Sequence, residues 1–100
     1  MSARDIRHVV IRGCVQGVGF RAWTDYIARE VGLEGWVRNR RDGTVEAVFA
    51  GPAQAVAKMI EACGRGPPAA LVEAVDVRAG SARDLAPRHP GEGFSVLPTI

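Results

Sequence analysis

Hydrophobic positions along the chain repeat with a period of two in some stretches and close to 3.6 in others, which predicts strands separated by helices. Residues 5–12 carry apolar side chains on both alternating sets, as expected of a strand inside a sheet. The next apolar positions are spaced by three, four and four, which predicts a helix over residues 21–32 that ends at Gly32. These positions are Phe20, Trp23, Ile27 and Val31.

The middle of the chain predicts a hairpin followed by a second helix. Residues 34–39 and 44–50 predict two strands, and Asp42-Gly43 between them is a strong hairpin signal. Apolar residues at i, i+3, i+4 and i+7 then predict a helix over residues 53–63, closed by Gly64. The apolar positions of this helix are Val56, Met59, Ile60 and Cys63.

The last third of the chain predicts two more strands. Residues 71–79 alternate in polarity, with Val75 and Val77 expected to face the core. Residues 81–92 contain two prolines and are expected to form a loop, and residues 94–97 predict a short final strand.

The element order is therefore βαββαβ with a short extra C-terminal strand. This order is typical of an α+β fold of the ferredoxin-like (split βαβ) class, a sandwich in which a mainly antiparallel sheet carries two helices on one face. The length of 100 residues predicts a single domain over residues 1–100.

A glycine-rich turn, Gly13-Cys14-Val15-Gln16-Gly17-Val18-Gly19-Phe20-Arg21, joins the first strand to the first helix. Its glycines let backbone N–H groups approach a ligand closely, and the start of a helix favours an anion. Arg21 places a cation where the helix dipole repels it, and a bound anion would relieve that conflict. The turn therefore predicts a phosphate site.

The predicted topology brings a second segment to this turn. The first two strands run parallel with the third between them, so their carboxyl ends lie at one edge of the sheet. The turn leaves the first strand at this edge, and Asn39 ends the second strand there. Arg21 and Asn39 are therefore expected to lie close together.

Two motifs carry a resemblance to a known family. Val15-Gln16-Gly17-Val18-Gly19-Phe20-Arg21, followed by Gly35-Trp36-Val37-Arg38-Asn39 and Asp42-Gly43, resembles the acylphosphatases. The resemblance extends over roughly residues 5–97 and implies hydrolysis of the carboxyl–phosphate bond of acyl phosphates. Where many relatives have a basic residue and an aromatic residue, this chain has Cys14 and Ala22.

The resemblance also implies roles for individual residues. Arg21 and the backbone amides of the turn would bind the phosphate, and Asn39 would position the attacking water. The turn residues concerned are Val15, Gln16, Gly17, Val18, Gly19 and Phe20.

The expected chemistry needs little beyond positioning and positive charge. The carboxylate leaving group has a conjugate-acid pKa near 4, so its departure requires no general acid. Arg21 and the turn amides would stabilise the transferring phosphoryl group, and the Asn39 carboxamide would hold water in line. We therefore expect no metal and no cofactor.

Composition limits the compartment and the partners that are expected for the protein. The net charge of +2 is weak support for binding to nucleic acid. The chain contains no run of 18 apolar residues, so no membrane span is expected. Cys14 and Cys63 are expected to be free thiols in a cytoplasmic protein. The expected partners are a small acyl phosphate and inorganic phosphate, with no nucleic acid and no membrane, for a protein that is a monomer by default.

The residues alone leave other interpretations open. The turn could be a tight connection without a ligand, Arg21 a solvated side chain, and Asn39 a turn residue. His8 is expected to be structural and His89 solvated.

Two other functions compete with the enzyme. One is a non-catalytic module of the same fold that binds phosphate or carbamoyl phosphate. The other is an RNA-binding module, which would need exposed aromatic side chains on the sheet, whereas Phe49 is expected to face the helices.

Overall fold

The computed structural model describes residues 3–100 and confirms the predicted βαββαβ order with a short extra strand. In chain order its elements are β1 (Arg4–Cys14), α1 (Phe20–Glu30), β2 (Glu34–Asn39), β3 (Val45–Pro52), α2 (Ala53–Cys63), β4 (Leu71–Ala79), the 3-10 turn η1 (Ala82–Leu85) and β5 (Phe94–Val96). No helix within residues 3–100 has the length and apolar character needed to cross a membrane.

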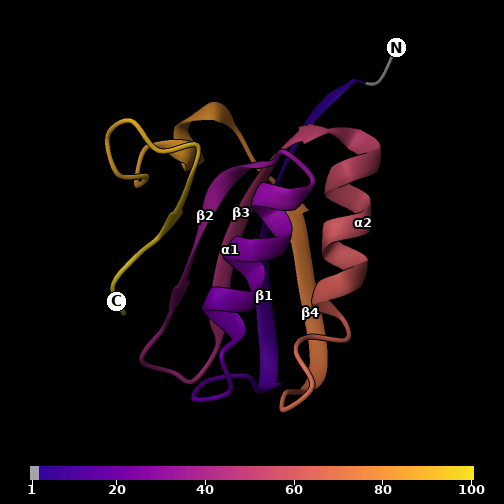
Figure 1. Ribbon diagram of the computed structural model, residues 1–100, viewed down its shortest axis with the longest axis vertical. Helices are drawn as coiled ribbons and strands as arrows, with labels where there is room; N and C mark the ends of the chain where they lie inside the picture. Colours follow the sequence, from indigo (N-terminus) through magenta and orange to yellow (C-terminus); the bar gives the residue numbers. More distant parts are fainter. Residues whose placement is uncertain (1–2) are drawn as a thin grey trace.

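The five strands form one sheet in the order β4-β1-β3-β2-β5, and both helices lie on the same face of it (Figure 1). Since β3 is antiparallel to both of its neighbours, β1 and β2 run parallel to each other, as predicted. The short β5 pairs in parallel with the outer side of β2. The carboxyl ends of β1 and β2, with the turns that follow them, therefore lie at one end of the sheet (Figure 1).

The main core lies between the sheet and the helices. Phe20 of α1, Phe49 of β3 and Phe94 of β5 are each 2 % exposed or less, and the last two rings stack with their centroids 6.1 Å apart. Burial of each ring contributes about 1.5–3 kcal/mol to folding. Phe49 therefore faces the helices, as expected.

A smaller core covers part of the opposite face. Trp36 of β2 is 2 % exposed there and packs with Leu85 of η1 and Leu97. Its indole Nε1 donates a hydrogen bond to the carbonyl of Asp84 at 2.6 Å. Trp36 is thus a core residue, and the segment after β4 folds back across the sheet to bury it.

Some details of the prediction were wrong. The segment 81–92 is not all loop, because a capping box between Ser81 and Asp84 starts η1 within it. The first helix ends at Glu30, since Val31 leaves the helical conformation and is 44 % exposed. Val77 is also 44 % exposed, because β4 is the edge strand of the sheet.

Candidate active site

A pocket of about 460 Å³ opens where α1 begins, beside the end of β2. The turn after β1, the first helical turns of α1, the end of β2 and the end of β5 all contribute side chains or backbone to it. The lining residues are Val15, Gly17, Gly19, Phe20, Arg21, Ala22, Asp25, Asn39 and Val96. The structure thus brings Arg21 and Asn39 into one pocket with the glycine-rich turn.

The turn adopts a conformation that its glycines permit. Gly17 and Gly19 have φ angles of 74° and 80°, which residues other than glycine rarely adopt. A Cβ atom at either position would meet nothing within 4 Å, so the glycines are required for the backbone conformation and not for space. In this conformation both glycines form part of the wall of the pocket.

The start of α1 leaves its backbone donors free of side-chain caps. Gly19 is the N-cap, and the first helical hydrogen bond runs from Trp23 N to the Gly19 carbonyl at 3.0 Å. The N–H groups of the preceding three residues therefore have no partner within the helix. The first turn contains no acidic residue, so the end of the helix dipole is not neutralised there.

Arg21 is half-buried in the wall of the pocket. Within residues 3–100, none of the salt bridges includes its guanidinium group. A cation beside free helix N–H groups is suited to a ligand that carries negative charge.

Asn39 lies at the carboxyl end of β2 and is held from both sides through its backbone. It pairs with Val45 of β3, and its carbonyl accepts a hydrogen bond from the N–H of Ile100 at 3.1 Å. The backbone position is therefore well defined, and Asn39 lines the same pocket as Arg21.

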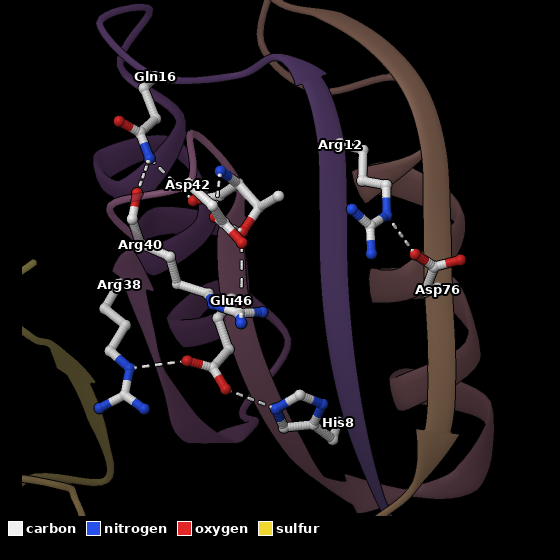
Figure 2. Close-up of polar contacts among 9 residues, drawn as sticks. His8, Arg12, Gln16, Arg38, Arg40, Asp42, Glu46 and Asp76 are labelled. Atoms are coloured by element: carbon white, nitrogen blue, oxygen red, sulfur yellow. Dashed lines mark hydrogen bonds and ion pairs between the residues drawn. The ribbon is translucent and has the colours of Figure 1, made fainter. Parts of the chain in front are cut away.

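Two of the six predicted phosphate-binding residues of the turn do not line the pocket. Val18 packs against the main core instead. Gln16 turns its side chain toward the β2–β3 connection, where Nε2 donates hydrogen bonds to the carbonyls of Arg40 at 2.7 Å and Thr44 at 2.9 Å (Figure 2). Gln16 thus links the glycine-rich turn to the hairpin that follows Asn39.

Asp25 and Val96 line the pocket although neither was expected there, and Ala22, expected only as a departure from its relatives, lines it as well. Asp25 lies four residues after Arg21 on the same face of α1, a spacing that could have indicated it. Val96 had no such signal, because only the parallel pairing of β5 with β2 brings it to the pocket.

His8 has a structural partner, as expected. Its Nε2 lies 2.7 Å from Glu46 Oε2, and Arg38 Nε donates to the other oxygen of Glu46 at 2.8 Å (Figure 2). Partial burial raises the pKa of Glu46, but the hydrogen bonds from His8 and Arg38 outweigh it and leave this pKa below its ordinary value. None of these three residues lines the pocket.

The remaining candidate groups also lie outside the pocket. Burial raises the pKa of the Cys63 thiol to about 12, so this cysteine is an inert core residue. Cys14 is exposed, and His89 is about half exposed with its Nδ1 3.0 Å from Glu92 Oε1. Residues 3–100 contain no cluster of three or more His, Cys, Asp or Glu side chains arranged to hold a metal ion.

Comparison with known proteins agrees with this geometry. The family model for acylphosphatase matches residues 7–95. The chain is 57 % identical over 95 residues to an acylphosphatase of Rhodopseudomonas palustris (strain BisB18), covering 95 % of this chain and 96 % of that protein. It is 55 % identical over 98 residues to an acylphosphatase of Bradyrhizobium diazoefficiens, covering 98 % and 99 % of the two chains.

A solved structure supports the same assignment at the level of the fold. The acylphosphatase from Coxiella burnetii superposes with a TM-score of 0.82 at 32 % identity, covering 94 % of this chain and 93 % of that one. Fold, pocket and sequence similarity over nearly the full length lead to one conclusion: the chain belongs to the acylphosphatase family.

Proposed function

We propose that this protein hydrolyses the carboxyl–phosphate bond of small acyl phosphates, releasing a carboxylate and inorganic phosphate, at the pocket of Arg21 and Asn39. Acyl phosphate hydrolysis is the activity that family membership supports. The observation that supports the assignment to this pocket is that Arg21 and Asn39 line one cavity with the uncapped N–H groups at the start of α1.

The phosphoryl group is bound by Arg21 and by the turn amides. The guanidinium group donates two parallel hydrogen bonds to phosphate oxygens, and the backbone N–H groups of the turn and of the start of α1 donate to the same group. Gly17 and Gly19 line the pocket with no side chain to obstruct this contact. These dipoles are already oriented before the substrate arrives, which is the basis of electrostatic catalysis.

Asn39 positions the attacking water. A carboxamide accepts one hydrogen bond from water and donates another, but it does not take a proton. The proton of the water passes to a phosphate oxygen or to solvent. Because the carboxylate leaves readily, the reaction needs neither a general acid nor a metal ion to assist its departure. We propose on this chemical ground that catalysis requires no metal and no cofactor.

The proposed setting is that of a cytoplasmic monomer with no nucleic-acid or membrane partner. The free cysteines Cys14 and Cys63 suit a reducing compartment. Phe49 is buried against the helices and Trp36 beneath η1, so neither aromatic side chain is available for stacking on RNA bases.

Hydrolysis of benzoyl phosphate in the presence of EDTA tests the proposal. We expect turnover by the wild type and its loss in both Arg21→Ala and Asn39→Ala. A wild type that binds phosphate without turnover would instead indicate a binding module of the same fold. Turnover that EDTA abolishes would contradict the metal-independent mechanism.

A further inference from the structure

One end of the pocket has no role in the mechanism above. Beyond Arg21, the pocket is lined by Ala22 and Asp25 of α1 and by Val96 at the end of β5. Ala22 is exposed, Val96 is 39 % exposed and the Asp25 side chain is 28 % exposed. This part of the pocket is therefore a small apolar surface with one carboxylate.

The carboxylate of Asp25 is held by Arg29, one turn further along α1. Arg29 Nε donates a hydrogen bond to Asp25 Oδ1 at 2.9 Å, and Arg29 Nη2 donates to the carbonyl of Phe94 at 2.7 Å. The two bonds join α1 to β5 through one guanidinium group. Asp25 lines the pocket and Arg29 does not, so the acidic member of this ion pair is the one nearer to a bound substrate.

We infer that Asp25 is a specificity-determining residue that selects acyl phosphates whose acyl group carries no negative charge. The inference rests on the proposed function, because it assumes that the phosphoryl group lies between the turn and Arg21. The acyl group must then extend away from that end, along Ala22 and Val96. Apolar acyl groups gain contact with these two side chains, whereas a second carboxylate on the acyl group approaches Asp25 and is repelled.

The size of the effect follows from Coulomb's law. Two like charges about 7 Å apart in a partly solvated site, with an effective dielectric constant of about 40–80, cost roughly three- to sevenfold in a rate ratio. This range is an upper limit, because the guanidinium of Arg29 offsets part of the charge of Asp25. The repulsion should weaken as salt is added, because the pocket is open to solvent.

Two substrates of equal shape isolate this charge. We would measure kcat/KM for 4-carbamoylbenzoyl phosphate and 4-carboxybenzoyl phosphate, which differ by one negative charge on the ring. For the wild type we expect the neutral substrate to be preferred. For Asp25→Asn we expect this preference to fall by up to roughly sevenfold at low salt. A comparison between the two enzymes cancels the difference in leaving-group chemistry of the two substrates.

A neighbouring carboxylate provides the control. Glu30 lies on the same helix and is exposed outside the pocket, so Glu30→Gln removes the same charge from α1. We expect Glu30→Gln to keep the wild-type preference. If Asp25→Asn and Glu30→Gln change the preference equally, the general charge of the protein decides it and the inference is wrong.

Failure of the inference and failure of the proposed function give different results. If the wild type hydrolyses neither substrate nor benzoyl phosphate, the proposed function fails. If it hydrolyses them and Asp25→Asn leaves the preference unchanged, the specificity role alone fails. If Asp25→Asn lowers kcat equally for both substrates, Asp25 acts on the reaction itself and the specificity role is again contradicted.

Discussion

At the scale of single residues, the start of α1 combines backbone N–H groups that have no side-chain cap with the positive charge of Arg21. Arg21 lies where a helix dipole disfavours a cation by about 0.3–1 kcal/mol at an exposed site. No acidic residue of the first turn offsets this cost. Asn39, in contrast, is fixed through its backbone and contributes an uncharged side chain. The two residues therefore predict different consequences when each is removed.

Replacement of Arg21 should separate activity from stability. We expect Arg21→Ala to lower kcat/KM by about 10²–10³, because the proposed mechanism then loses a key donor to the transition state. The melting temperature should stay equal or rise, because the variant also removes a cation opposed to the helix dipole. Arg78→Ala, which removes an exposed arginine outside the pocket, is the matched control for both measurements. A melting temperature lowered by Arg21→Ala alone would assign this side chain a structural role.

Replacement of Asn39 should separate turnover from binding. We expect Asn39→Ala to lower kcat while the Kd for inorganic phosphate changes little, because the role proposed for Asn39 is to position water and not to bind phosphate. Calorimetric titration with phosphate beside steady-state kinetics measures both quantities. Loss of phosphate binding with an unchanged kcat would show that Asn39 does not act through water.

At the scale of elements, the site depends on how the turn after β1 meets the β2–β3 hairpin. The carboxamide of Gln16 donates to two carbonyls of the hairpin and so joins the glycine-rich turn to the segment that follows Asn39. A second constraint lies just before the turn, where β1 has a bulge between Arg12 and Gly13. A side chain at Gly13 would collide with the backbone carbonyl of Leu71 on β4, so only glycine fits there.

Removal of the Gln16 side chain should loosen this link. We expect Gln16→Ala to lower the free energy of unfolding by about 1–3 kcal/mol, because two hydrogen bonds to part-buried carbonyls are lost. The KM for benzoyl phosphate should rise as well, since the turn is no longer held against the hairpin. Gln54→Ala replaces an exposed glutamine of α2 and is the control in chemical denaturation and kinetics. Equal effects of the two substitutions would show that the link has no importance.

At the scale of the whole molecule, the two faces of the sheet have different characters. The helix-covered face is a continuous apolar core. The opposite face combines the smaller core around Trp36 with a polar chain across three strands, from His8 of β1 through Glu46 of β3 to Arg38 of β2. Arg38 also lies over the Trp36 ring, with its Cζ 4.6 Å from the ring centroid. The polar chain therefore joins the central strands to the second core.

This polar chain predicts a loss of stability in acid. The pKa of Glu46 is lowered in the folded protein, so its contribution is fully present above the unfolded pKa of about 4.5. The contribution is lost as the pH falls through the lower, folded value. We expect the melting temperature of the wild type to drop more steeply below pH 4.5 than that of Glu46→Gln. The exposed Glu30→Gln should follow the wild type. Parallel curves for all three proteins would contradict the role of Glu46.

The element order, the glycine-rich turn and the placement of Arg21 follow from the sequence because they depend on local rules. Hydrophobic period decides between helix and strand over a few residues, and β2, α2 and β4 accordingly have the predicted bounds. The meeting of Arg21 and Asn39 also follows, since the direction of each strand in a split βαβ fold determines which ends share an edge. Their catalytic roles stay predictions.

Tertiary structure alone decides the rest, because it depends on contacts between distant segments. Val31 and Val77 fit the periodic pattern yet are 44 % exposed, since a local period does not record where a helix ends or which strand lies at the edge. Val96 reaches the pocket only through the pairing of β5 with β2. Asp25 pairs with Arg29 through a local i, i+4 contact, whereas the bond that ties Arg29 to a carbonyl of β5, 65 residues away in the chain, is tertiary. Short stretches of sequence thus determine the helices and strands through their local periodicity. The end of the pocket lined by Asp25 and Val96 instead arises from packing between segments that share no local pattern.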